Sequence, residues 1–164
     1  MARRIFFSFH YQLDHWRVQQ VRQSWRFREG NEAQPFYDHA DWEKVKRGGD
    51  AAIQKFIDDN LRGSSATVVL AGAETAGRKW VNYEIKTSYE DQKGLLVVRI
   101  HSLKNQSQER TSPGRNPLDD WTIERGGRVV ELSSVFKSYD WVTDDGNSNL
   151  ADWVEEAIRL RSSI

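Results

Sequence analysis

The sequence contains no cysteine among its 164 residues, which excludes disulfide bonds, a thiolate nucleophile and cysteine-based zinc sites. Its 24 Lys and Arg residues are balanced by 24 Asp and Glu residues, and this lack of net charge argues against binding to nucleic acid or to an anionic membrane surface. No stretch approaches the ~18 apolar residues of a membrane span, and the apolar run after Arg3 and Arg4 is too short for a signal peptide. We therefore expect a cytoplasmic protein that binds neither nucleic acid nor membrane.

Histidine is scarce and aromatic residues are abundant. The four histidines are scattered along the chain, so we expect no metal site. The seven Trp, seven Phe and five Tyr residues are enough to build a core and to leave rings that stack on a ligand. Because 164 residues is close to the ~150 typical of one domain, we expect residues 1–164 to form a single domain.

Apolar runs alternate with helical patterns along the chain. Residues 4–9, 65–71 and 95–100 are typical of strands buried in a parallel sheet, and residues 139–142 are a candidate last strand. Residues 14–30, 50–61, 77–92 and 150–158 have the apolar spacing of amphipathic helices. This alternation indicates βαβ units and predicts a doubly wound α/β fold.

Three segments fit this alternation less well. Residues 36–38 suit a brief edge strand that leads into a polar loop at 38–41. Residues 105–120 form a long polar insertion that we expect to be mobile. Residues 122–132 contain Arg125, Gly126 and Gly127 between short apolar pieces, which predicts a small hairpin.

A glutamate in the helix at 77–92 is the most informative residue. Ligands of doubly wound sheets bind beyond the carboxyl ends of the strands, here at the loops of residues 8–12 and 72–78. With Trp80 set at zero and about 100° per residue, Glu84 falls at about 40°, inside the apolar stripe that Val81 and Ile85 continue. Burial penalises the charged form of such an acid. Glu84 either extends its carboxyl to solvent, pairs with an arginine such as Arg78 or Arg99, or takes part in chemistry.

Other patterns exclude functions or indicate surface. The paired glycines match neither the dinucleotide-binding fingerprint nor the P-loop, and Ser8 has no sequence context of a nucleophile. The first strand does not end in the clustered acids that a receiver domain uses to hold Mg²⁺. Arginines of the first helix are offset by nearby acids, which favours a solvated helix face over a nucleic-acid site; they are Arg17, Arg22, Arg26 and Arg28.

Two motifs carry a resemblance to a known family that covers nearly the whole chain. The run RIFFSFHY at residues 4–11, the Arg- and Trp-rich helix after it, and RKWVNYEI at residues 78–85 resemble the short prokaryotic TIR-like domains, most closely the TIR proteins of the Thoeris anti-phage system. The resemblance implies a flavodoxin-like fold with a mainly parallel, five-stranded sheet and helices on both faces.

The resemblance also implies an activity and a site. In TIR enzymes the glutamate of a WxxxE-like helix breaks the bond between nicotinamide and ribose in NAD+, and Glu84 matches that position. The substrate contacts carried over from the family are Ser8, Phe9, His10, Tyr11 and Trp80. NAD+ is then the substrate and no cofactor is expected. The RDxxPG-like box of animal TIR adaptors is absent, and residues 36–42 occupy that region. His10 stands where many TIR domains have arginine.

The resemblance favours an enzyme of anti-phage defence that makes a cyclic ADP-ribose-type signal for a separate effector protein. A non-enzymatic TIR interaction module and a nucleoside deoxyribosyltransferase remain as alternatives. A trigger derived from phage and a homo-oligomeric state are further hypotheses that the residues leave open.

Overall fold

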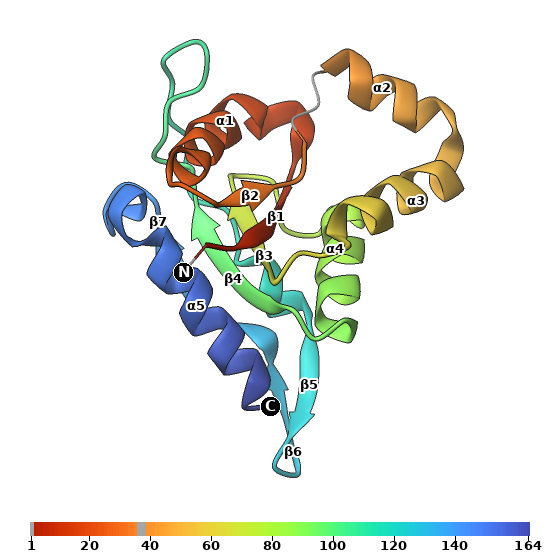
Figure 1. Ribbon diagram of the computed structural model, residues 1–164, viewed down its shortest axis with the longest axis vertical. Coiled ribbons are helices and arrows are strands. Elements are labelled where there is room, and N and C mark those ends of the chain that lie inside the picture. The colour runs from red at the N-terminus through yellow and green to blue at the C-terminus, as the bar shows by residue number, and fades with distance from the viewer. Residues whose placement is uncertain (1, 36–38) are drawn as a thin grey trace.

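A parallel sheet of five strands forms the middle layer, in the order β2-β1-β3-β4-β7 (Figure 1). The computed structural model describes residues 2–35 and 39–164. The strands are β1 (Arg4–Phe9), β2 (Glu32–Ala33), β3 (Ala66–Ala71), β4 (Gly94–Arg99) and β7 (Ser138–Asp140). Every neighbouring pair is parallel, and the strand order reverses between β1 and β3. The predicted doubly wound, flavodoxin-like α/β fold is confirmed.

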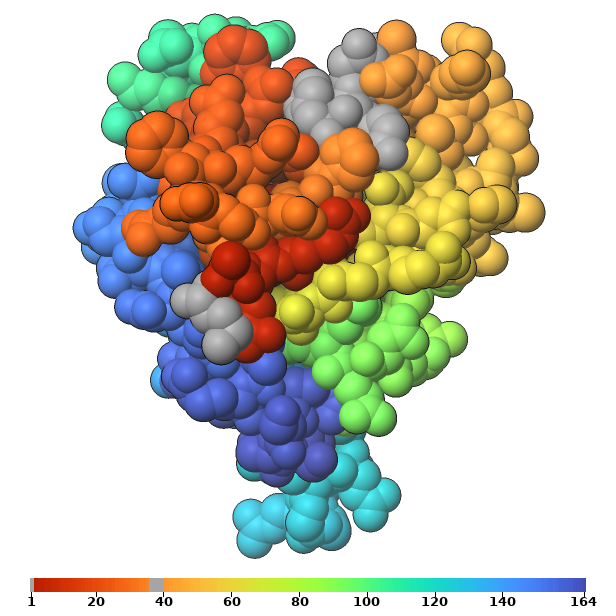
Figure 2. Space-filling model, in the orientation of Figure 1, coloured from red at the N-terminus to blue at the C-terminus, as the bar shows by residue number. Residues whose placement is uncertain are grey.

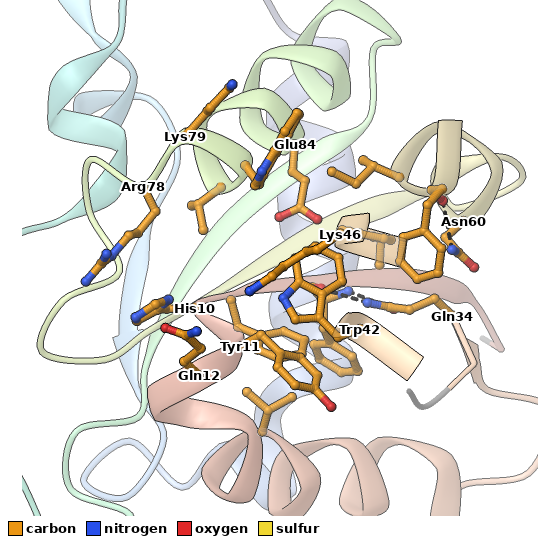
Figure 3. Close-up of a pocket in the computed structure, with 18 of the residues that line it drawn as sticks. His10, Tyr11, Gln12, Gln34, Trp42, Lys46, Asn60, Arg78, Lys79 and Glu84 are labelled. Carbon is orange, nitrogen blue, oxygen red and sulfur yellow. Dashed lines mark hydrogen bonds between the residues drawn. The ribbon is translucent and has the colours of Figure 1, made fainter. Parts of the chain in front are cut away.

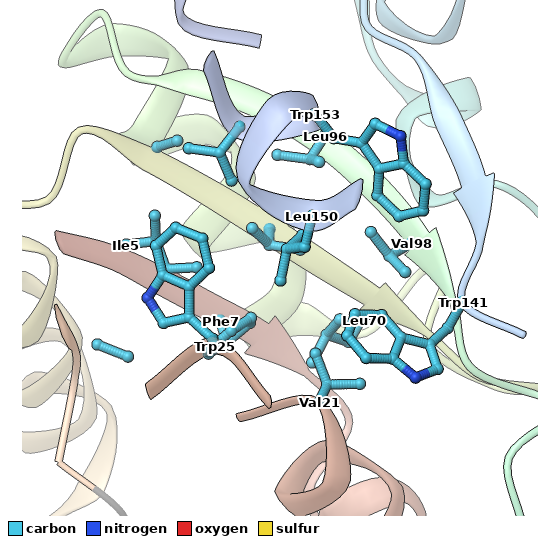
Figure 4. Close-up of a cluster of buried hydrophobic side chains, with 14 of the residues drawn as sticks. Ile5, Phe7, Val21, Trp25, Leu70, Leu96, Val98, Trp141, Leu150 and Trp153 are labelled. Carbon is cyan, nitrogen blue, oxygen red and sulfur yellow. The ribbon is translucent and has the colours of Figure 1, made fainter. Parts of the chain in front are cut away.

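Two long helices cover one face of the sheet. Helices α1 (Tyr11–Phe27) and α5 (Gly146–Ser162) bury the larger hydrophobic core against it. In Figure 4, Trp25 from α1 and Leu150 and Trp153 from α5 lie over Phe7 of β1 and Leu96 of β4. The apolar residues predicted in the helices at 14–30 and 150–158 therefore do face the core.

The opposite face is covered by α3 (Gly49–Leu61) and α4 (Lys79–Glu90). Because strand side chains alternate, Val69 and Ala71 of β3 pack toward this face while Val68 and Leu70 pack toward the other. Beyond α4 the layer is completed by short elements in the segment that follows β4, namely η1 (Pro117–Asp120), β5 (Thr122–Arg125), β6 (Arg128–Glu131) and η2 (Leu132–Ser134).

The predicted hairpin is confirmed as the antiparallel pair β5 and β6. Its turn residues Gly126 and Gly127 have φ of +60° and +78°, the left-handed region that glycine adopts at little cost. The hairpin projects from the lower end of the molecule in Figures 1 and 2. In the described part of the chain, no helix combines the length and the apolarity needed to cross a bilayer.

The region around the shortest strand departs from the prediction. The edge strand expected at 36–38 lies outside the described residues, and the observed edge strand is β2. Helix α2 (His39–Arg47) was not predicted, because few of its residues are apolar. Tertiary packing stabilises it: the Trp42 ring of α2 lies 6.0 Å from the Phe56 ring of α3.

Two arginines of α1 differ from the solvated helix face that the sequence predicted. Arg17 and Arg22 are buried, not part of a solvated face, because both follow the apolar stripe of α1. The Arg17 guanidinium donates to the carbonyl oxygens of Leu103 at 2.8 Å and Glu109 at 3.0 Å. These bonds tie the segment after β4 to α1; the mobility expected for residues 105–120 stays a prediction.

Candidate active site

The candidate site lies where β1 and β3 end, at the reversal of strand order. The loop after β3 is fixed against α1 by Asp14, which is buried and accepts a 3.4 Å hydrogen bond from the Thr75 hydroxyl. The amide of Gly72 donates to that same hydroxyl oxygen at 2.8 Å. A Cβ atom at Gly72 would lie 2.3 Å from an Asp14 carboxylate oxygen, so only glycine fits there. This loop leads directly into α4.

Glu84 is held on the inner face of α4. Its residue is 9% exposed, and its Oε1 accepts a 2.8 Å hydrogen bond from the Ser8 hydroxyl of β1. Burial raises the pKa of the Glu84 carboxyl to about 8, against the smaller opposing effect of the Ser8 hydrogen bond. In the described residues no Lys, Arg or His lies within ion-pair distance of this carboxyl.

The two arginines considered as partners of Glu84 are engaged elsewhere. The Arg78 guanidinium contacts the carboxylate of Glu74 at 3.5 Å, and Arg99 donates to the carbonyl oxygen of Gly114 at 2.8 Å. One turn further along α4, Ser88 forms a 2.6 Å hydrogen bond with Thr67 of β3. Within the described residues, Glu84 is therefore not half of an ion pair with either arginine.

A cavity of about 390 Å³ opens in front of Glu84. Aromatic rings from five elements line it: Phe9 ends β1, Tyr11 begins α1, Trp42 comes from α2, Phe56 from α3 and Trp80 from α4. The Tyr11 ring lies 5.9 Å from Phe9 and 5.8 Å from Trp42, which makes one continuous aromatic wall. Such a wall offers stacking surface for a heteroaromatic ring.

Basic groups surround the mouth of the cavity. In Figure 3, Arg78 and His10 lie together on one side, Lys46 crosses the space, and the Glu84 carboxylate points into it. Burial, followed by the nearby Arg78 charge, lowers the pKa of His10, which favours its neutral imidazole form. Arg78 thus supplies a positive charge beside the position where many TIR domains have arginine.

The structure brings most of the residues predicted for the site together. Phe9, His10, Tyr11, Trp80 and Glu84 all line the cavity. The sixth predicted residue, Ser8, is fully buried behind Glu84 and is not among the lining residues. Its hydroxyl contacts the carboxyl, which makes it a positioning residue.

Several residues that line the cavity were not predicted as site residues from the sequence. Those are Arg22, Gln34, Trp42, Lys46, Phe56 and Asn60. Arg22 carried a usable signal, because it lies four residues after Val18 and three before Trp25, in the apolar stripe of α1. The other five residues come from segments that lie near β1 only in the folded protein. No pattern among neighbouring residues in the sequence predicts that proximity.

The arrangement suits chemistry that develops positive charge. A desolvated carboxyl faces an aromatic cavity, and basic groups at the mouth suit an anionic portion of a ligand. No cluster of three or more His, Asp or Glu residues positioned for a metal ion occurs in residues 2–35 and 39–164.

Comparisons with known proteins identify the family of the chain. Residues 6–105 match the family model described as "Thoeris protein ThsB, TIR-like domain". A relative from Bacillus cereus (strain MSX-D12), named "Putative cyclic ADP-D-ribose synthase ThsB1", is 32% identical over 191 residues, covering 94% of this chain and 100% of the relative.

Proposed function

The chain belongs to the TIR-like domain family of Thoeris ThsB proteins, and from that premise we propose that it cleaves NAD+ and makes a cyclic ADP-ribose-type product. The observation that supports this most is the Glu84 carboxyl, which is buried, has no cationic partner among the described residues and faces an aromatic cavity. A module that only docks a partner protein has no use for a desolvated acid in this position.

Cleavage breaks the bond between the nicotinamide nitrogen and C1′ of the ribose. The bonding electrons go to the pyridinium nitrogen, so nicotinamide leaves as a neutral molecule and needs no general acid. Positive charge develops on the ribose as an oxocarbenium ion, and the ionised Glu84 carboxylate stabilises it. The cationic pyridinium ring also favours the ionised form of Glu84 when substrate is bound.

The second half of the reaction decides between hydrolysis and cyclisation. Closure to a cyclic product needs a nucleophilic group of the same nucleotide, an adenine ring nitrogen or a ribose hydroxyl, to attack C1′ before water does. The aromatic wall of Phe9, Tyr11, Trp42 and Trp80 supports this outcome, because stacked rings hold a folded nucleotide and exclude water. The product then leaves as a small diffusible molecule that activates a separate effector protein, after a trigger that the infecting phage supplies.

The substitution Glu84→Gln tests the proposal. Glutamine has nearly the same shape but no charge, so NAD+ turnover should fall at least ~100-fold while the fold is kept. The matched control is Glu90→Gln, which neutralises an exposed acid on the same helix. Release of nicotinamide and formation of the cyclic product are followed by chromatography and mass spectrometry. Unchanged turnover in folded Glu84→Gln would refute the proposal.

A further inference from the structure

Arg22 is a buried cation that the proposed mechanism does not use. It lies on α1, is 8% exposed and lines the cavity. One guanidinium nitrogen donates to the main-chain carbonyl of Gln34. In the described part of the chain no carboxylate lies within ion-pair distance of Arg22. Burial, helped by the like charge of Arg26, lowers the pKa of Arg22 to about 10, still far above neutrality.

The other basic residues at the cavity differ from Arg22. Arg78, Lys46 and Lys79 each contact a carboxylate, the first at 3.5 Å from Glu74 and the second at 3.0 Å from Glu43. A charge removed from water is costly unless an opposite charge compensates it. Arg22 is thus the basic lining residue whose compensating anion is absent from the described chain.

A short chain of hydrogen bonds connects Arg22 to Glu84. The Gln34 side chain pairs with the backbone of Phe7, accepting from its amide at 2.9 Å and donating to its carbonyl at 2.7 Å. The next residue, Ser8, donates to Glu84. Because β2 pairs with β1 only at Arg4 and Ile5, the edge of β1 beyond them has no strand partner among the described residues, and the Gln34 side chain bonds the backbone there.

The cavity extends around that edge. Its lining includes Phe6 and Phe7, consecutive residues of β1 whose side chains point to opposite faces of the sheet. Glu84 lines it from α4 on one face, and Arg22 lines it from α1 on the other. One cavity therefore holds a desolvated acid and a desolvated base at separate walls, each without an ionic partner among the described residues.

We propose, on the basis of the proposed NAD+-cleaving function, that Arg22 binds a phosphate group of the dinucleotide while Glu84 faces its cationic nicotinamide ring. The substrate also carries two opposite charges at separate places, a positive one at the scissile ring and a negative one at the pyrophosphate. A planar guanidinium matches phosphate oxygens with paired hydrogen bonds. Arg22 then fixes the direction in which the dinucleotide enters and makes the site specific for phosphate-bearing ligands.

Binding of ADP-ribose tests the proposal, since ADP-ribose carries both phosphates and lacks the nicotinamide bond. Its Kd is measured by titration calorimetry with the full chain. Arg22→Gln removes the charge and keeps a donor for the Gln34 carbonyl; it should weaken binding at least ~30-fold, the scale of losing a buried charged contact. Arg22→Lys keeps a positive charge and should lose less. Arg26→Gln, which removes an exposed cation on the same helix, should bind as wild type does.

Circular dichroism and melting temperature establish that each variant is folded. The proposal is overturned if folded Arg22→Gln binds ADP-ribose within ~3-fold of wild type, if Arg22→Lys is as weak as Arg22→Gln, or if wild type does not bind ADP-ribose. Its failure is separable from that of the proposed function. Binding that depends on Arg22 in a protein that releases no nicotinamide, even in an extract of infected cells, supports the phosphate site and refutes the enzyme. Nicotinamide release with an unchanged KM for NAD+ in Arg22→Gln supports the enzyme and refutes the phosphate site.

Discussion

The Glu84 carboxyl lowers the stability of the protein as the pH rises. In the unfolded chain its pKa is near the ordinary 4.5, and in the folded protein burial raises it to about 8. Between these values the folded state holds the extra proton, so this group's contribution to stability is lost as the pH increases toward 8. A buried carboxyl that destabilises the fold at neutral pH indicates a role in function and not in folding.

Glu84→Gln should therefore stabilise the protein, and more so at higher pH. We expect the unfolding free energies of variant and wild type to be similar near pH 4.5 and to differ by a few kcal/mol, in favour of the variant, near pH 8. Urea denaturation at several pH values measures this difference. A difference that does not change with pH would show that Glu84 ionises normally in the folded protein.

Ser8 should act on activity through the ionisation of Glu84. Because the carboxylate is the reactive form, kcat/KM should fall about tenfold per pH unit below the pKa of Glu84 in the free enzyme. The Ser8 hydrogen bond favours that form, so Ser8→Ala should move the acid limb of the pH profile to higher pH. The control is Ser88→Ala, which removes a buried hydroxyl that bonds Thr67 instead, and its pH profile should match that of wild type.

At the scale of the elements, one ion pair holds α1 against two loops beside the site. Arg17 and Asp14 are both buried and lie 3.2 Å apart, nitrogen to oxygen. Asp14 also contacts the loop after β3 through Thr75, and Arg17 contacts the segment after β4 through Glu109. The pair thus connects α1, the loop after β3 and the segment after β4, all at the carboxyl-terminal ends of the strands.

Replacing Arg17 by Met should destabilise the protein by about 3 kcal/mol or more, because it leaves the Asp14 carboxylate buried without its partner. Trypsin should also cut faster at Arg110, which lies in the segment that Arg17 holds. Adding Asp14→Asn to this variant should recover part of the stability, since the unpaired charge is then gone. A double variant no more stable than Arg17→Met would contradict this account.

At the scale of the molecule, the described residues form a cavity that holds the candidate catalytic Glu84, and we propose that the effect of this chain on infection passes to another molecule. We expect a protein-free filtrate from triggered cells that carry this chain to activate the purified effector, and filtrate from the Glu84→Gln strain to be inactive. Effector activity, measured after addition of each filtrate, checks this. If both filtrates are inactive and direct mixing of the two proteins activates the effector, signalling occurs by contact and the chain is an interaction module.

The sequence alone determined the layers of the fold and the residue at the centre of the site. Strands β1, β3 and β4 were recognisable because strands buried on both faces need continuous apolar runs, which are a local property of the chain. The paired glycines of the hairpin and the position of Glu84 in the stripe of α4 were recognisable for the same reason. Turn chemistry and helical periodicity act over a few neighbouring residues.

Only the tertiary structure decided which groups surround Glu84. The Ser8 hydroxyl meets its carboxyl across 76 positions of sequence, and Arg22 and Trp42 reach the same cavity from elements that share no pattern with α4. An acid in an apolar stripe is equally compatible with an ion pair and with an unpaired, reactive carboxyl. The distinction depends on where Arg78 and Arg99 point, and their directions are set by long-range packing of the loops that follow β3 and β4.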